Sequence, residues 1–143
     1  MESVVVPVNY FAVFGAAILS MVIGYIWYGP LLGKAWIKEI GMTKEKMESA
    51  KSSMGKSYGM MFIGSLIMAY VLQHALVFSA AYLKMTGIPA GIMTGFFNWI
   101  GFIAPVTLGS VLWEGKSWKL WIINNGYYIV TLLAMSTLLS IWQ

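Results

Sequence analysis

Long uncharged stretches alternate with short charged ones along this chain. Four runs contain no Asp, Glu, Lys or Arg: Ser3–Gly33, Ser57–Leu83, Met85–Trp113 and Leu120–Gln143. A helix of about 20 apolar residues crosses a hydrocarbon core of about 30 Å, and each run is longer than that. The runs also lack the alternation typical of transmembrane strands. The sequence therefore predicts an all-α integral membrane bundle of four transmembrane helices in one domain, 1–143, with spans at about 8–29, 57–83, 88–113 and 120–142.

The composition agrees with this class and excludes several chemistries. Hydrophobic residues make up 59% of the chain and charged residues 10%, and the mean hydropathy is +0.76, unlike a soluble domain. The chain has no cysteine, which excludes disulfides, thiolate catalysts, iron–sulfur clusters and zinc–cysteine sites. No cofactor is evident and no metal site is expected. Because no basic residue precedes the first run, which is too long for a signal peptide, we expect it to be retained.

Lysines are distributed unevenly between the loops, and this predicts an orientation. Six lie between Lys34 and Lys56, after the first span, and Lys116 and Lys119 follow the third span, whereas Lys84 stands alone between the second and third. Positive charge near span ends stays in the cytoplasm, so both termini are predicted to be outside. The net charge of +4 is interpreted as a topology signal and as contact with the lipid bilayer. Nucleic-acid binding is not expected, because arginine is absent.

Two features are predicted at the membrane surface on the lysine-rich side. Apolar and charged residues alternate at helical spacing over Lys44–Met54, and Thr43 precedes them as a suitable N-cap. This predicts a short cytoplasmic interfacial helix between the first and second spans. Aromatic residues cluster around the same loops and are predicted to be interface anchors, namely Trp27, Tyr28, Trp36, Trp113, Trp118 and Trp121.

Small residues recur at four-residue spacing in two spans, where they allow helices to approach closely. The predicted packing positions are Ala12, Ala16, Ser20 and Gly24 in the first span and Gly87, Gly91 and Gly95 in the third. Packing within one chain is favoured over a homodimer, although both remain open. Pro105 cannot donate to the helix ladder and is predicted to bend the third span. Matching corners, Gly33–Trp36 and Gly115–Trp118, indicate either a duplicated hairpin or a chance recurrence.

Polar residues inside the spans are the best pointers to function, because burying them in lipid is costly. Their depths define two layers, one with His74 and Asn98, and one with Asn124, Asn125, Thr107 and, approximately, Ser65. Asn9 and Gln73 complete the predicted ligand-binding or polar cluster. Hydrogen bonding between helices explains both layers most simply, and a ligand or permeation site is the alternative.

Three segments resemble a known family. They are Val8-Asn9-Tyr10, the stretch Gly24-Tyr25-Ile26-Trp27-Tyr28-Gly29-Pro30-Leu31 leading into Gly33-Lys34-Ala35-Trp36, and Ile123-Asn124-Asn125-Gly126-Tyr127. In these the chain resembles the bacterial four-span membrane family catalogued as domain of unknown function number seventeen sixty-one. The resemblance implies a four-helix integral membrane fold in the bacterial cytoplasmic (inner) membrane. It brings no catalytic residue and no substrate.

The residue inventory limits the mechanisms that are open. Carboxylate-dependent antiport is disfavoured because the chain has no aspartate and every glutamate lies at or outside the interface. A hydrolase would need an acid to orient its base, and His74 has no such partner within the spans. Three functions remain: a homo-oligomeric permeation or transport protein for an uncharged or weakly polar solute, a non-catalytic membrane binding or scaffold protein, and a cofactor-dependent membrane enzyme. We expect the first.

Overall fold

Four long helices form the molecule, which a computed structural model describes over residues 5–143 without any strand in that range. The first is α1 (Tyr10–Ile26), extended by the π-helix η1 (Trp27–Leu31), and the second is α4 (Met54–Leu83). The third consists of α5 (Gly87–Asn98), the π-helix η2 (Trp99–Ile103), α6 (Ala104–Thr107) and α7 (Gly109–Leu112), and the fourth is α8 (Trp118–Ile141). Each is long and apolar enough to cross a membrane. The all-α class is confirmed, and the four helices of membrane-spanning length have limits close to the predicted ones.

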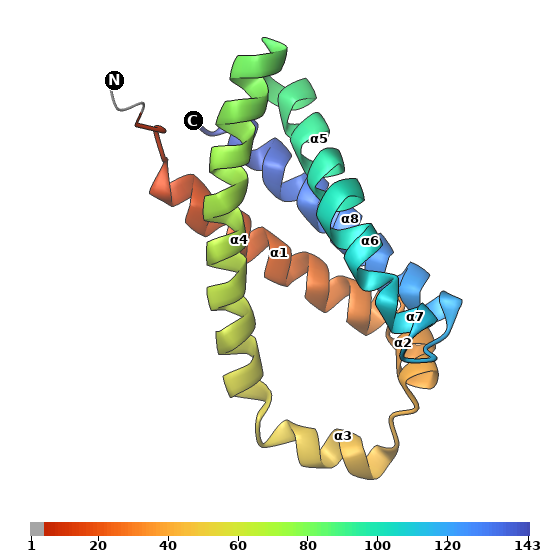
Figure 1. The fold of residues 1–143 in the computed structure, drawn as a ribbon. Helices are drawn as coiled ribbons and strands as arrows, with labels where there is room; N and C mark the ends of the chain where they lie inside the picture. The colour runs from red at the N-terminus through yellow and green to blue at the C-terminus, as the bar shows by residue number, and fades with distance from the viewer. Residues whose placement is uncertain (1–4) are drawn as a thin grey trace.

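The two ends of the bundle differ in charge. One end holds α2 (Gly33–Ile40), α3 (Lys44–Lys51) and the turn between α7 and α8, and with them eight of the nine lysines. We call it the lysine-rich end. The other end, which we call the terminal end, holds the start of α1, the turn between α4 and α5, and the C-terminus (Figure 1).

The helices pack unequally. Figure 1 shows α5 and α8 running side by side, whereas α1 crosses α4 steeply and then diverges from it towards the lysine-rich end. Helix α8 contacts the three other long helices and lies at the centre of the packing. The buried core, which includes Leu76, Met135 and Leu139, lies where α1, α4, α5 and α8 meet.

The small-residue stripe of α1 packs inside the chain, as predicted. Ala12, Ala16 and Ser20 are fully buried against the neighbouring helices. Gly24 lies next to a ring of α8, and a Cβ there would stand 3.3 Å from the Tyr127 hydroxyl oxygen. These residues therefore allow α1 to approach its neighbours closely within one chain.

The glycines of α5 bring two helix backbones together. A Cβ on Gly95 would lie 2.8 Å from the Leu132 carbonyl oxygen and 2.9 Å from Leu133 Cα, and Gly91 lies equally close to α8. Gly87 has a different role. It starts α5 with a φ of +64°, which favours glycine, and a Cβ there would meet nothing within 4 Å. The prediction that Gly87 is a packing residue is wrong. The four-residue spacing extends to the first residue of α5, where no neighbouring helix comes close.

The third span is interrupted around Pro105, where a bend was predicted. The π-helix η2 immediately precedes α6, and its last turn is closed by the Ala104 N–H, which donates to the Trp99 carbonyl. The proline stands at the start of α6, where its missing N–H is least costly. A second π-turn, η1, contains Pro30 in the first span.

The connection between the first and second spans contains two helices. The predicted short helix is α3, and the Lys46 N–H donates to the Thr43 hydroxyl at 3.3 Å, so Thr43 is the N-cap. Helix α2 was not predicted. It ends at Gly41 in a left-handed conformation with φ of +67°, and near its end Glu39 accepts a hydrogen bond from Ser117, the N-cap of α8, at 2.6 Å.

Candidate functional site

A cluster of polar side chains centres on Asn125 of α8, towards the lysine-rich end. Asn125 is only 3% exposed, and its Oδ1 accepts from Trp99 Nε1 at 3.1 Å. Its Nδ2 donates to Thr107 Oγ1 at 3.0 Å and to the Trp121 carbonyl at 3.2 Å. The Trp121 indole in turn donates to Thr107 Oγ1 at 3.1 Å. The structure thus brings Asn125 and Thr107 together, as their shared depth predicts.

Asn124 belongs to a second set of contacts, which joins α8 to the first span. Its Oδ1 accepts from the Tyr28 hydroxyl at 2.8 Å, and the Ile123 carbonyl accepts from Trp27 Nε1 at 2.9 Å. Gly126 makes room for this indole, because a Cβ there would lie 2.7 Å from Trp27 Cζ2. Two of the segments that carry the family resemblance, one in each half of the chain, therefore contact each other.

The predicted interface anchors divide into two groups. Trp113 and Trp118 are exposed, at 86% and 55%, as an anchor in the interface requires. Trp27, Tyr28 and Trp121 also hold helices together: each donates a hydrogen bond to a partner on another helix, because a half-buried indole or phenol needs one. Their role as interface anchors stays a prediction. The ring of Trp36 packs edge-on against Tyr28, at 5.1 Å between centroids.

Ser65 and Ser20 form a separate polar contact between α4 and α1. The Ser20 hydroxyl donates to Ser65 Oγ at 2.8 Å and is fully buried. Depth alone placed Ser65 near the asparagine layer, but it faces α1 instead of α8. This contact holds two helices together at the point where they cross.

His74 and Asn98 are not joined by a hydrogen bond within residues 5–143. His74 Nδ1 lies 2.9 Å from the carbonyl oxygen of Tyr70, and Asn98 Nδ2 donates to the Thr94 carbonyl at 2.8 Å. Each side chain contacts the carbonyl four residues earlier in its own helix. The predicted cluster is therefore not formed, since a shared depth does not place two side chains on facing sides of their helices.

Asn9 also has a local role. Its Oδ1 accepts from the backbone N–H groups of Phe11 and Ala12 at 3.1 and 3.2 Å, which makes it the N-cap of α1. Asparagine is among the residues preferred at this position. Its place among the predicted ligand-binding residues stays a prediction.

Three buried oxygen atoms have no hydrogen-bond partner in the described part of the chain. They are Gln73 Oε1, Thr94 Oγ1 and Thr131 Oγ1, and their side chains are 2%, 1% and 2% exposed. A buried polar atom without a partner costs about 1–3 kcal/mol, so such atoms are rare and call for an explanation. Of the three, only Gln73 was among the predicted site residues.

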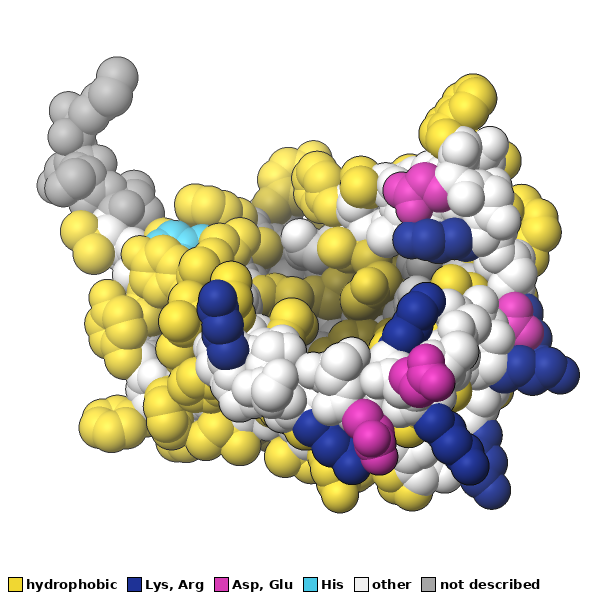
Figure 2. Space-filling model, turned by 90° about the horizontal axis from the view of Figure 1, so that it is seen from below, with side chains coloured by type: hydrophobic (Ala, Val, Ile, Leu, Met, Phe, Trp, Pro, Cys, Tyr) yellow, Lys and Arg dark blue, Asp and Glu magenta, His cyan; other side chains and the backbone are white. Residues whose placement is uncertain are grey.

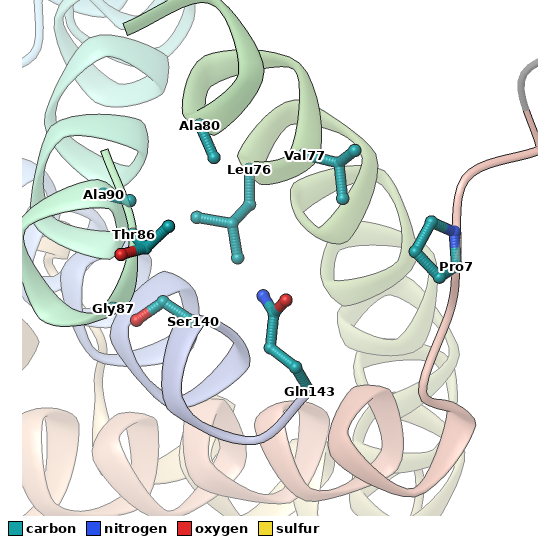
Figure 3. Close-up of a pocket in the computed structure, with 9 residues that line it drawn as sticks. All are labelled: Pro7, Leu76, Val77, Ala80, Thr86, Gly87, Ala90, Ser140 and Gln143. Atoms are coloured by element: carbon teal, nitrogen blue, oxygen red, sulfur yellow. The ribbon is translucent and has the colours of Figure 1, made fainter. Parts of the chain in front are cut away.

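A pocket opens at the terminal end, about one helical turn from two of the residues that carry these atoms. It has a volume of about 260 Å³ and lies between α4 on one side and α5 and α8 on the other (Figure 3). Leu76, Ser140 and Gln143 point into its space, and Ala90 lies on its wall. Gln73 and Thr94 come one helical turn deeper on α4 and α5, below Leu76 and Ala90.

Sequence reasoning missed Thr94, Thr131 and Trp99. The two threonines carry no signal, because threonine is common on apolar helices. Trp99 did carry one: it lies near the middle of a span, away from the interfaces where tryptophan is usually enriched. An indole at that depth needs a buried acceptor, which Asn125 provides.

The fold and these sites define a class, that of small helical proteins with four apolar helices of membrane-spanning length, tied together by buried polar side chains. Residues 5–143 contain no group of three His, Cys, Asp or Glu side chains that could hold a metal ion. The chain belongs to the family described as Protein of unknown function (DUF1761), whose model matches residues 11–140. The predicted family is therefore confirmed. No curated protein and no solved structure matches the chain.

Proposed function

We propose that the protein is a permeation or transport protein for a small uncharged solute that donates hydrogen bonds. The proposed route follows the seam between α4 and the α5–α8 pair. The observation that carries it is the pair of unpartnered buried oxygens, Gln73 Oε1 and Thr94 Oγ1, one turn below an open pocket. A passing solute would satisfy both atoms, which explains why they are kept unpaired.

The chemistry of the seam indicates the solute class. Gln73 Oε1 is an acceptor, and a threonine hydroxyl both donates and accepts, so a solute with hydroxyl or amide groups fits. The residues lining the pocket include no charged side chain, and Gln73 and Thr94 are neutral. A charged solute would have no counter-charge there and would bear a large desolvation penalty.

The route needs movement of α4, because side chains close the seam below the pocket. The α5 and α8 backbones are in contact at Gly91 and Gly95 and leave no space between those two helices. We therefore assign the movement to α4. The homo-oligomer stays part of the proposal, and the large apolar side chains exposed on the four long helices leave surface for such contacts.

Solute flux into liposomes tests the proposal. Proteoliposomes would be exposed to glycerol or urea, and swelling would be followed by light scattering. Gln73→Leu and Thr94→Val remove the unpartnered atoms at nearly constant volume and should slow flux about tenfold, which corresponds to about 1.4 kcal/mol. Ser79→Ala is the control on α4, because its hydroxyl is satisfied by the Ala75 carbonyl. Parent flux equal to that of empty liposomes would exclude the proposal for these solutes.

The proposed location is the bacterial cytoplasmic membrane, with the lysine-rich end inside and both termini outside. The lysine asymmetry supports it, since eight lysines lie at one end. Single cysteines at Ser49 and Gln143 would be probed in intact cells with an impermeant maleimide. We expect labelling at Gln143 alone, and the opposite pattern would reverse the orientation.

A further inference from the structure

Helices α1 and α4 leave an apolar opening between them towards the lysine-rich end. They touch where they cross, at the Ser20–Ser65 hydrogen bond and at the Phe14 and Phe62 rings, whose centroids are 5.6 Å apart. Beyond the crossing the two helices separate (Figure 1). A pocket of about 280 Å³ lies between them, lined by Ile18, Met21, Val22, Tyr25, Tyr58 and Phe62.

The walls of this pocket are suited to a hydrocarbon chain. All six lining side chains are aliphatic or aromatic, and Tyr25 and Val22 are 68% and 49% exposed on helices of membrane-spanning length. Among residues 5–143, only side chains of α1 and α4 line this pocket, and no third helix covers it. Exposed apolar surface of this kind is filled in a membrane either by lipid chains or by another protein.

The charge around the opening distinguishes these two occupants. The segment from α2 to the start of α4 carries six lysines and three glutamates, a net charge of +3. Within residues 5–143 the ion pairs are Lys116–Glu114 and Lys119–Glu39, so none of those six lysines is paired with a carboxylate. Seen from the lysine-rich end, the molecule is hollowed, with apolar side chains inside and lysines around the mouth (Figure 2).

Unpaired lysines at the mouth of an apolar pocket match an anionic amphiphile. Each lysine near an anionic lipid surface contributes about 1 kcal/mol of attraction. A second copy of the chain would instead bring two sets of unpaired lysines together, which is unfavourable. A zwitterionic lipid would fill the pocket but gain nothing from the net positive charge.

We propose that the opening between α1 and α4 is a binding site for an anionic phospholipid of the leaflet at the lysine-rich end. One acyl chain occupies the pocket between α1 and α4, and the phosphate lies among the lysines between Lys34 and Lys56. The site is separate from the seam between α4 and the α5–α8 pair, and it does not depend on solute permeation.

Photo-crosslinking tests the site directly. The protein would be placed in phosphatidylcholine nanodiscs with a trace of phosphatidylglycerol that carries a diazirine on its acyl chain. After irradiation, mass spectrometry would locate the label. We expect it mainly in residues 18–25 and 58–62, and we expect unlabelled phosphatidylglycerol to compete about tenfold better than added phosphatidylcholine. Labelling spread evenly over the four long helices would overturn the proposal, as would equal competition.

Variants separate the acyl chain from the headgroup. Val22→Trp fills the pocket and should reduce labelling at both segments at least fivefold. Replacing Lys34, Lys38 and Lys56 by glutamine should remove the preference for phosphatidylglycerol while leaving label in the pocket. The controls are Ile92→Trp, on an exposed face of α5, and Lys84→Gln, at the terminal end, and neither should change labelling.

Folding and dimerisation are checked with the same material. Circular dichroism and gel filtration of each variant show whether it is folded, so that a loss of label is not caused by misfolding. If Val22→Trp does not fold, the milder Val22→Phe takes its place. Dimerisation is tested with the Tyr25→Cys variant in nanodiscs. If this variant forms a disulfide dimer and the pocket carries no label, a second copy occupies this face and the proposal is overturned.

Discussion

Substitution of Gly95 by alanine tests the close packing of α5 on α8. A Cβ at this position would lie 2.8 Å from the Leu132 carbonyl oxygen and 2.9 Å from Leu133 Cα, both of them backbone atoms. Carbon atoms prefer separations of about 3.5–4.0 Å, so the helices must part by roughly 0.6 Å or more at this point. A side chain could turn away from the new methyl group, but a helix backbone cannot.

The magnitude follows from this displacement. A gap of about 0.5–1 Å loses a quarter to a half of the dispersion energy of each contact, and overpacking of this kind costs about 1–3 kcal/mol. Alanine also favours the helix over glycine by up to about 1 kcal/mol. Gly64→Ala on α4 is the control. It gains the same helix propensity, but a Cβ at Gly64 would meet nothing within 4 Å. The difference in stability between the two variants therefore reports the packing cost alone. We expect Gly95→Ala to be about 1–3 kcal/mol less stable than Gly64→Ala.

The free energy of unfolding of both variants would be measured in bicelles by steric trapping. A third variant identifies the atoms responsible. Adding Ser136→Ala to Gly95→Ala removes the nearest atom, the Ser136 hydroxyl oxygen at 2.5 Å, and leaves the two backbone contacts. It should restore less than half of the loss. Full restoration, or equal stability of Gly95→Ala and Gly64→Ala, would refute backbone contact as the reason for glycine here.

Three further predictions test the contacts that α8 makes with the first and third long helices. Asn125→Leu leaves the Trp99 indole N–H unpaired and should lower the free energy of unfolding by about 1–3 kcal/mol, whereas an unchanged value would mean that the bond contributes nothing. Tyr28→Phe and Asn124→Leu should show a coupling of about 0.6–1.7 kcal/mol in a double-mutant cycle, and purely additive losses would contradict the bond. Gly126→Ala should lower the thermal midpoint through its clash with the neighbouring indole, and normal stability would contradict that clash.

The number and limits of the four long apolar helices could be predicted because they depend on one-dimensional quantities. The length of an uncharged run and the placement of lysines are read directly from the chain, and neither depends on which helices are neighbours. The N-cap at Thr43 was also predictable, since its contact to Lys46 is local. The small residues of α1 were identified for the same reason, as their spacing defines one face whatever packs against it.

The pairing of polar side chains could not be predicted fully, because depth leaves helix rotation undetermined. Asn125 and Thr107 share a depth and face each other, whereas His74 and Asn98 share a depth and do not. The π-turns were missed too. Each π-turn holds about one more residue than a regular helical turn, which rotates all the residues that follow it. Beyond Trp99, a 3.6-residue period therefore assigns side chains to the wrong face of the third long helix.

The two π-turns fix the first and third spans to the fourth at one level. Each begins at a tryptophan whose indole donates to α8, Trp27 to the Ile123 carbonyl and Trp99 to Asn125 Oδ1. The two acceptors are only two residues apart. Helix α4 takes no part in this network, and in the described part of the chain its side-chain hydrogen bonds to other helices come from Ser65 alone. Helix α4 is therefore the span least restrained by polar contacts.

This asymmetry predicts which helix moves. Spin labels at Val71 on α4 and Val130 on α8 should give a broad distance distribution in lipid, whereas labels at Phe97 on α5 and Val130 should give a narrow one. The three positions are all exposed, so the labels disturb little packing. The contrast follows because α5 meets α8 through backbone contact at Gly91 and Gly95, while α4 meets α8 through side chains that can rearrange. Two equally narrow distributions would show that apolar packing alone holds α4 rigid, and passage along its seam would then require a different movement.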